Sequence, residues 1–597
     1  MTDRLVGRSD LLRAAARFLR RGDPGVAVVG PRGAGVSSVL IRVALDARAQ
    51  GRRVRHVVAP HFVAPHFVDP ADGAGPTTEL LVVDDADRLD PATAETLRAA
   101  AVEGAVQLVA GWHTPEAVPG PLAWCAASGL LTRLDVGPFG VDDTVAYLES
   151  RLGAGIHRAS AATLGRYGAG LPAWIAPACD AALAAGHLER RAGLWRCTAL
   201  GPPIPAMLDR ARGELARLAP GDADAFGRLC VAGAMPLRFA TTLLGADTIG
   251  RLERSGLVAV DDTVTAAVPA LADAVRTVVG RAASAAIASG LVAAADASVA
   301  ATDLARWRVA AHEPVSSAEC ALAAEDARRR GDDATAERLA RRAADAGDRR
   351  AMWLLAEILQ GHGRRTEAVE VLAHLGGVDA PDGLADLARI EHATILLWDL
   401  ARPDEAVAMV DELVRRAPGR RTEREVRAAA AATTLFAGRP ADATVLAAAL
   451  LDGADHAAAT AWMVAAAAGA VVGDGAAAVA AARRARSVRA GLAAAPGAAG
   501  PEVHLAVLVL ALGEAGALRE ADATARAAYD GALRAPPGHA RVGGARVGAR
   551  VPAHRRGNAR RAARARSGRR VRRGGAARVL AVGDRGPGHR QRVPRAW

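Results

Sequence analysis

One stretch near the N-terminus, Val26–Ser38, restricts the possible fold more than any other part of the chain. It begins as an apolar strand and continues into a glycine-rich turn, and the next residues are apolar at helical spacing. A strand, a tight turn and a helix in this order form a phosphate-binding loop. Gly30, Gly33 and Gly35 would allow backbone N–H groups to surround a phosphate.

This loop departs from the pattern G-x-x-x-x-G-K-[ST] at one position. Val36 stands at the lysine position and is followed by Ser37 and Ser38, of which Ser37 would bind Mg²⁺ through its hydroxyl. A charge about 4 Å from a phosphate contributes about 1 kcal/mol in water and about 4 kcal/mol at a dielectric near 20. Loss of the lysine therefore predicts ATP binding weakened by about 5-fold to 1,000-fold. Hydrolysis should suffer more, and Arg32 would partly compensate, although nothing in the spacing requires it.

A second run, Glu79–Asp85, has four apolar residues that end on two carboxylates. This pattern predicts a buried strand of a parallel sheet with its acids at the ligand-binding edge. Asp84 would hold Mg²⁺ through water, and Asp85 would orient or activate an attacking water. The alternative is that both acids only cap the next helix. A third strand over residues 106–110 should end nearby, and His113 beyond it is interpreted as a solvated loop residue rather than a weak substitute for an arginine.

The fold class predicted from these patterns is multidomain, α/β plus α. An N-terminal P-loop domain with a parallel sheet precedes a helical lid and a winged-helix-like domain, and an α-solenoid and a disordered basic tail follow. The acidic turn at Asp261 and Asp262 favours a structural over a DNA-reading role for the winged-helix-like part. The predicted divisions are 1–155 for the nucleotide-binding domain, 156–205 for the lid, 206–285 for the winged-helix-like domain, 286–535 for the repeats and 536–597 for the tail.

A short turn followed by a helix start recurs along the alanine-rich part of the chain. Successive copies are 32 to 43 residues apart, and two helices fit into each interval. A period near 34 residues is typical of degenerate tetratricopeptide repeats. A concave surface for a protein or small-molecule effector and a plain scaffold are both open. The alanines that end each turn are Ala336, Ala368, Ala406, Ala443, Ala478 and Ala521.

The net charge of +12 is concentrated in the tail. Residues 536–597 contain 18 arginines and one acid, whereas the preceding residues contain 58 arginines and 63 acids. The mildly acidic body therefore gives no sign of a nucleic-acid surface. For the tail we favour an out-of-frame translation, because apolar periodicity ends abruptly inside a helical repeat. The alternative is a disordered basic arm attracted to phosphates.

The first residues lack the apolar region of a signal peptide. The most apolar window, Ala457–Gly473, is short and alanine-rich, which predicts a packed helix rather than a membrane span. We therefore expect a cytoplasmic protein that does not contact a membrane. Five scattered cysteines without C-x-x-C spacing argue against a disulfide framework or a zinc site.

Taken in order, several motifs resemble the large ATP-binding LuxR-type transcriptional regulators of actinobacteria, which belong to the STAND class of AAA-like P-loop NTPases. The resemblance covers roughly residues 1–535. The motifs are Leu5–Arg8, Gly30–Ser37, Leu81–Asp90, Arg133–Phe139, Gly170–Pro172, Ala185–Leu188, Gly193–Trp195 and Leu252–Val258.

The resemblance implies a switch that binds ATP or ADP with Mg²⁺, helical repeats that sense an effector, possible oligomerisation on nucleotide binding, and a DNA-binding end. Gly7 and Arg8 would lie by the nucleotide, and Pro172 would pack on its base. This chain departs from the family at Val36, lacks the usual arginine around Gly111–His113, and shows no C-terminal helix-turn-helix. The predicted function is a nucleotide-switched regulator without its DNA-binding end. The alternatives are a catalytically inactive P-loop scaffold that mediates protein contacts and a basic-tailed nucleic-acid binder.

Overall fold

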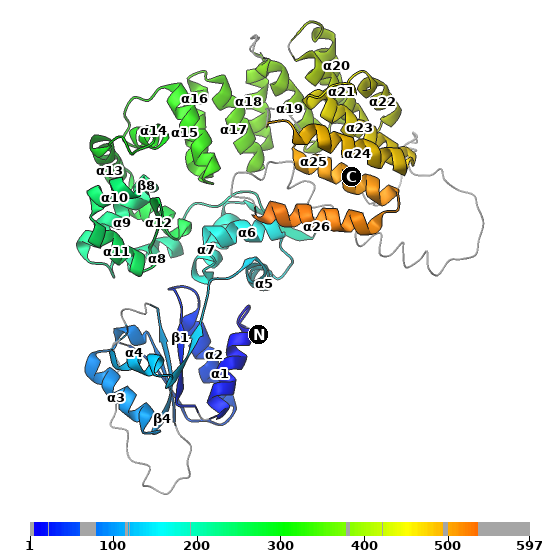
Figure 1. The fold of residues 1–597 in the computed structure, drawn as a ribbon. Helices are drawn as coiled ribbons and strands as arrows, with labels where there is room; N and C mark the ends of the chain where they lie inside the picture. The colour runs from blue at the N-terminus through cyan, green and yellow to red at the C-terminus, as the bar shows by residue number, and fades with distance from the viewer. Residues whose placement is uncertain are drawn as a thin grey trace, which may run out of the picture. The chain divides into compact units, whose positions relative to one another are not determined.

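The computed structural model describes most of the chain before the arginine-rich tail (Figure 1). The predicted tail, 536–597, lies outside the described residues, so neither explanation for it is tested. The described residues are 5–21, 23–59, 79–113, 118, 120–191, 193–377, 383–420, 422–493 and 500–534.

A parallel sheet of five strands forms the N-terminal part, in the order β2-β3-β4-β1-β5. The predicted strands are present, and the edge strand β5 was not expected. Because β4 lies between β1 and β3, the loop after β1 and the acids after β3 flank the end of β4. The strands are β1 (Gly25–Val29), β2 (Val54–Val58), β3 (Glu79–Asp84), β4 (Val106–Trp112) and β5 (Leu131–Asp135).

Helices cover both faces of this sheet, with α1 and α2 on one side and α3 and α4 on the other (Figure 1). Successive residues of a strand point to opposite faces. Val26 and Val28 of β1 accordingly pack in one apolar cluster with α2, and Ala27 and Val29 pack in the other with α3 and α4. The helices are α1 (Ser9–Arg21), α2 (Val36–Ala49), α3 (Pro91–Val102) and α4 (Gly120–Ala127).

The middle of the chain contains helices and short antiparallel strands. The predicted strand pair turns at Asp261 and Asp262, where the Asp261 amide donates to the Thr263 carbonyl at 3.0 Å. A third strand, β8, pairs with β10 and was not expected. The assignment to the winged-helix class stays a prediction. The elements are α5 (Val141–Leu152), α6 (Arg158–Tyr167), α7 (Pro172–Ala184), β6 (Leu188–Arg191), β7 (Leu194–Cys197), α8 (Pro205–Leu215), α9 (Pro220–Ala232), β8 (Ala234–Pro236), α10 (Leu237–Leu244), α11 (Ala246–Arg254), β9 (Val258–Val260), β10 (Thr263–Ala266) and α12 (Pro269–Val279).

Polar side chains join three of these helices. The Tyr167 hydroxyl at the end of α6 donates to the Asp273 carboxylate of α12 at 2.8 Å. Arg276, also on α12, pairs with Asp273 and donates to the Cys230 carbonyl of α9 at 3.3 Å. Burial raises the pKa of Asp273. The lid helix α6 is thereby attached to the helices that follow it.

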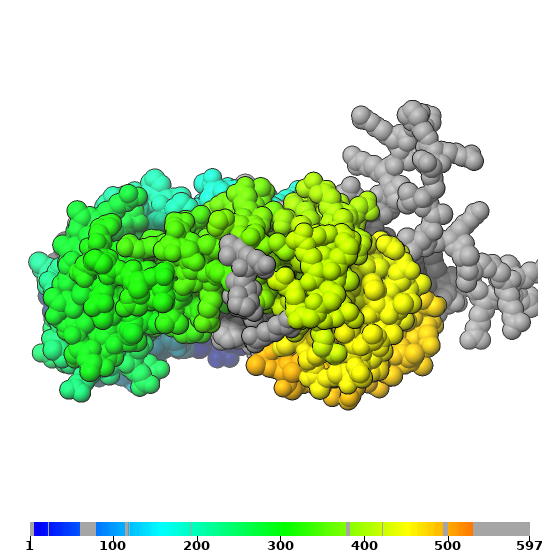
Figure 2. Space-filling model, turned by 90° about the horizontal axis from the view of Figure 1, so that it is seen from above, coloured from blue at the N-terminus to red at the C-terminus, as the bar shows by residue number. Residues whose placement is uncertain are grey.

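Alanine-rich helices make up the rest, and Figure 2 shows them following one another in chain order from green to yellow. Each of the six alanines expected at a helix start is the fourth residue of the second helix in a pair, and all six are buried. Small side chains at these positions allow close helix packing, as predicted, although the tetratricopeptide class stays a prediction. The helices are α13 (Arg281–Ala294), α14 (Ala301–Ala310), α15 (Ser317–Arg329), α16 (Asp333–Asp345), α17 (Arg349–Gly361), α18 (Arg365–Gly377), α19 (Leu384–Trp398), α20 (Pro403–Arg416), α21 (Glu423–Phe436), α22 (Pro440–Ala448), α23 (His456–Val472), α24 (Gly475–Ala490), α25 (Pro501–Glu514) and α26 (Leu518–Arg534).

Among the described residues, no single helix is both long and apolar enough to cross a membrane. By length and composition alone, the pair α12 and α13 would qualify together, but the two helices meet at a bend of 106°. The apolar window in α23 is largely buried in the helical repeats, as expected for a packed helix. All five cysteines are free.

A charged cluster joins α16 to the end of α17. The His362 ring lies 3.7 Å from the Asp333 carboxylate and 3.5 Å from the Glu337 carboxylate, and its side chain is 14% exposed. Burial lowers the pKa of His362, but hydrogen bonds to the two carboxylates outweigh it and raise the pKa to about 9. Protonated His362 therefore stabilises this helix pair at neutral pH.

Because the pKa of His362 is higher in the folded than in the unfolded chain, its contribution is complete below about pH 6.5 and is lost as the pH rises through 9. The shift corresponds to about 3 kcal/mol at most. We expect the local opening free energy of α16 and α17, from hydrogen exchange corrected for intrinsic rates, to fall between pH 7 and 9.5. The variant H362Q should lack this dependence; an equal fall in H362Q would contradict the assignment.

Candidate functional site

The glycine-rich loop after β1 has the backbone shape that its glycines allow. Gly33 and Gly35 have φ values of +86° and +103°, a region that favours glycine. At Gly30 the constraint is space, because a Cβ there would lie 2.4 Å from the Val136 carbonyl oxygen. Each glycine of the predicted motif therefore has a physical reason to be glycine.

Carbonyl oxygens along this loop are bound by groups that surround it. Arg8 reaches the loop from before α1, His113 from after β4, and Ala173 from the first turn of α7. The remaining partners belong to the loop itself and to α2. The contacts are Gly30 O with His113 Nδ1 at 3.3 Å, Pro31 O with Ala34 N at 3.0 Å, Gly33 O with Ala173 N at 3.3 Å, Ala34 O with Arg8 Nη2 at 3.0 Å, and Gly35 O with Val39 N at 3.0 Å.

Amide groups of the same loop are left unused. Among the described residues, the N–H groups of Arg32, Gly33 and Gly35 have no backbone acceptor. The loop leads directly into α2, whose first amides also lack acceptors within the helix. Free N–H groups in a glycine-rich turn at a helix N-terminus form an anion-binding site.

The lysine position of the motif is part of the protein core. Val36 is the first residue of α2 and its side chain is 1% exposed. It packs towards β4, where a Cβ on Gly111 would lie 2.9 Å from Val36 Cγ1. Ser37 is partly exposed and Ser38 is exposed. The loop thus retains the hydroxyl expected to bind Mg²⁺ and has an apolar contact in place of the charge.

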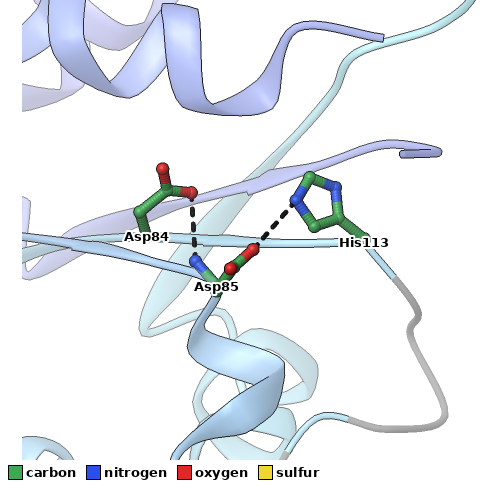
Figure 3. A group of neighbouring side chains, drawn as sticks. All are labelled: Asp84, Asp85 and His113. Atoms are coloured by element: carbon green, nitrogen blue, oxygen red, sulfur yellow. Dashed lines mark hydrogen bonds and ion pairs between the residues drawn. The ribbon is translucent and has the colours of Figure 1, made fainter. Parts of the chain in front are cut away.

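Two acids end the third strand of the sheet (Figure 3). Asp84 is buried as the last residue of β3 and accepts a hydrogen bond from the Asp85 amide at 3.0 Å. Asp85 has φ +53°, which is uncommon for a residue other than glycine. Its side chain makes no capping hydrogen bond, and α3 is capped by Asp90 instead. Helix capping therefore does not account for Asp84 and Asp85.

His113 joins these acids to the loop. Its Nε2 lies 3.2 Å from Asp85 Oδ1, and its side chain is 8% exposed, so the interpretation as a solvated residue is wrong. The physical reason is that β4 continues past Ala110 to Trp112, which brings His113 to the sheet edge. The hydrogen bond from His113 lowers the pKa of Asp85.

The cluster of Asp84, Asp85 and His113 has the geometry of a cation site. Their ligand atoms lie within 4.8 Å of one another (Figure 3). Carboxylate oxygens are the ligands that Mg²⁺ prefers, and it is usually held by one or two carboxylates together with phosphate oxygens. Asp84 therefore suits its predicted Mg²⁺ role, and Asp85, which is predicted to orient water, is in contact with His113.

The residues assigned by resemblance lie against the loop. Arg8 is buried, donates to the carbonyls of Ala34 and Gly137, and stacks on the Phe139 ring at 4.7 Å. Burial lowers the pKa of Arg8. In this arrangement Arg8 fixes the loop backbone, and Gly7 precedes it in a left-handed conformation with φ +69°.

Pro172 begins α7, and the next residue contacts the loop. The Ala173 amide donates to the Gly33 carbonyl, and a Cβ on Gly33 would lie 2.9 Å from Ala173 Cβ. Helix α7 therefore rests on the glycine-rich loop. Direct contact of Gly7, Arg8 or Pro172 with a nucleotide stays a prediction.

Asp87 is a further member of the site that the sequence analysis did not identify. It accepts a hydrogen bond from the His113 amide at 3.4 Å and lies 3.8 Å from the Arg32 guanidinium. Its spacing could have identified it, because Asp87 follows Asp85 by two residues among the acids after β3. Its role depends on the position of β4, which no local pattern specifies.

No protein-family model matches the chain, and no curated protein matches it. Among solved structures, RuvB of Thermotoga maritima, described as the Holliday junction branch migration motor, is 16% identical. The match covers 44% of this chain and 93% of RuvB at a TM-score of 0.27. Cdc6p of Pyrobaculum aerophilum is 13% identical, with 46% and 95% of the two chains covered and a TM-score of 0.26. Likenesses this weak carry no argument about function.

The loop geometry predicts a difference between two glycine variants. Gly33→Ala and Gly51→Ala both place an alanine at positive φ, which costs about 1–2 kcal/mol. Only the Gly33 variant also meets α7, because a Cβ at Gly51 has open space around it. Hydrogen exchange at the start of α7 should therefore accelerate in G33A and stay unchanged in G51A. Equal protection of α7 in the two variants would contradict the contact.

Proposed function

We propose that this protein binds Mg·ATP or Mg·ADP in the loop Gly30–Ser38. The observation that supports the proposal is the hydrogen bonding of the loop backbone: most of its carbonyl oxygens have partners, whereas the amides of Arg32, Gly33 and Gly35 have no backbone acceptor among the described residues. Free amides in a turn of this kind at a helix N-terminus attract an anion.

The acids after β3 complete the proposed site. Asp84 and the Ser37 hydroxyl would hold Mg²⁺, Asp84 through water, and Mg²⁺ would neutralise charge on the phosphates. Asp85 would orient or activate an attacking water. Hydrolysis is expected to be weak or absent, because Val36 provides no charge where negative charge develops in the transition state.

We further propose that the nucleotide acts as a switch in a signalling protein of the LuxR-type, STAND class. Two contacts favour this proposal over simple nucleotide storage. The loop is in contact with the lid helix α7 through Gly33 and Ala173, and α6 is attached to α12 through Tyr167 and Asp273. The helical repeats would bind a protein or small-molecule effector, and oligomerisation on nucleotide binding is part of the same proposal.

A catalytically inactive scaffold is the second candidate function. It is favoured by one observation, the burial of Val36 in the apolar core at the position where a P-loop carries its lysine. In this case the fold and the repeats would support protein–protein contacts without any nucleotide. Nucleotide binding distinguishes the two functions.

Calorimetry on the full-length chain tests the proposal with a matched pair of variants. Wild-type protein should bind Mg·ATP weakly, and V36K should bind it about 5- to 1,000-fold more tightly because the lysine charge is restored. V36M has a side chain of similar length without charge and carries a similar packing cost beside Gly111. It should bind no more tightly than wild type.

Two results would contradict this account of the loop. Micromolar binding by wild type that V36K leaves unchanged would mean that the lysine position is unimportant here. Absence of binding by wild type and by V36K, with both variants folded by circular dichroism, would favour the scaffold.

A further inference from the structure

Arg32 is a cation in the candidate loop with unused hydrogen-bonding capacity. Its guanidinium faces the acids beyond β3, with Nη2 3.8 Å from Asp87 Oδ2, and its side chain is 29% exposed. At 3.8 Å this is an ion pair without a hydrogen bond. A guanidinium has five N–H donors in a planar fork, and Arg32 donates none of them within the described part of the chain.

Its partner Asp87 is poorly compensated for a buried carboxylate. The side chain is 3% exposed, and Oδ2 receives only a long hydrogen bond of 3.4 Å from the His113 amide. Oδ1 is buried without a hydrogen-bond partner among the described residues. A buried charge with so few hydrogen bonds is costly, so Asp87 favours a cation beside it. Asp87 thus holds Arg32 at this end of the loop without using its donors.

The other side chains around the loop are uncharged, already hydrogen-bonded or outside the loop. Arg8 is buried and donates to two carbonyls, and Val36 has no charge. Arg88 lies 3.8 Å from Asp85 and follows β3 rather than belonging to the loop. His113 contacts the Gly30 carbonyl and Asp85 with its two ring nitrogens. Arg32 is therefore a cation within the loop whose side chain is partly exposed and whose N–H donors are not used by the described residues.

We propose that Arg32 binds the terminal phosphate of the nucleotide and so sets a preference for ATP over ADP. This inference rests on the proposed function. Arg32 faces Asp85 and Asp87, which lie at the sheet edge where Mg²⁺ and the terminal phosphate are expected. The arginine fork suits two-point recognition of a phosphate. Arg32 would supply the positive charge that Val36 does not supply at the start of α2.

Calorimetry with Mg·ATP and Mg·ADP on the full-length chain tests the inference. R32A should bind Mg·ATP about 10- to 100-fold more weakly than wild type, and Mg·ADP less than about 3-fold more weakly. R32K keeps the charge without the planar guanidinium. Its affinity for Mg·ATP should lie between those of wild type and R32A. In the double variant R32A/V36K, the new lysine should recover most of the affinity for Mg·ATP.

R42A is the matched control, because Arg42 lies on α2 and its exposed side chain pairs with Asp46. It removes the same charge from the neighbourhood and should leave both affinities unchanged. Melting temperature and circular dichroism verify that each variant is folded, and R32Q provides a second neutral variant.

The outcomes distinguish failure of the proposed function from failure of the role of Arg32. If wild-type protein binds neither nucleotide, both the proposed function and this inference are wrong. Wild type that binds ATP, with R32A and R32Q retaining its affinity and its preference over ADP, overturns the inference alone. Equal weakening of ATP and ADP in folded R32A also overturns it, because Arg32 would then act on a part that both nucleotides share.

Discussion

The candidate site depends on one backbone constraint, the need to satisfy the carbonyl oxygens of a partly buried loop. Polar backbone groups removed from water are costly unless they are paired. In this protein the partners come from separate elements: Arg8 before α1, His113 after β4, and Ala173 on α7. Each of these contacts removes a carbonyl from the loop interior. The free amides are thus a consequence of how α1, β4 and α7 surround the loop, rather than of the glycines alone.

The same contacts make helix α7 part of the candidate site. Ala173 on α7 holds the Gly33 carbonyl, and six residues earlier the Tyr167 hydroxyl holds Asp273 on α12. The turn between α6 and α7 includes Gly170, whose carbonyl accepts from the Phe139 amide at 2.7 Å. A shift of the loop therefore requires either a matching shift of α7 or the loss of these hydrogen bonds. In the proposed switch, this arrangement would transmit a movement of the loop to α7.

The sequence predicts those features of the structure that neighbouring residues determine. Apolar runs identified β1, β3 and β4, and the turn pattern identified alanines such as Ala336 that are buried at helix starts. The short, half-exposed strand β5 was not predicted, and α1 was not predicted either, although its residues have a clear amphipathic helical pattern. The place of His113 depends on where β4 ends, and that of Asp87 depends on His113. These are long-range consequences of strand order, which the local sequence does not encode.

The position of Val36 shows how the loss of a charge can become part of the fold. Its side chain fills space against β4 beside Gly111, where a Cβ would lie 2.5 Å from Leu40 Cδ1 and 2.9 Å from Val36 Cγ1. Valine and glycine therefore fit each other, and the start of α2 gains apolar packing. Packing of this kind does not attract a phosphate, so positive charge must come from elsewhere. Arg32 lies towards the acids of β3, so the positive charge of the loop is at the sheet edge rather than at the start of the helix. In the proposed function the terminal phosphate lies at this edge, so Arg32 rather than a lysine on α2 would contact it.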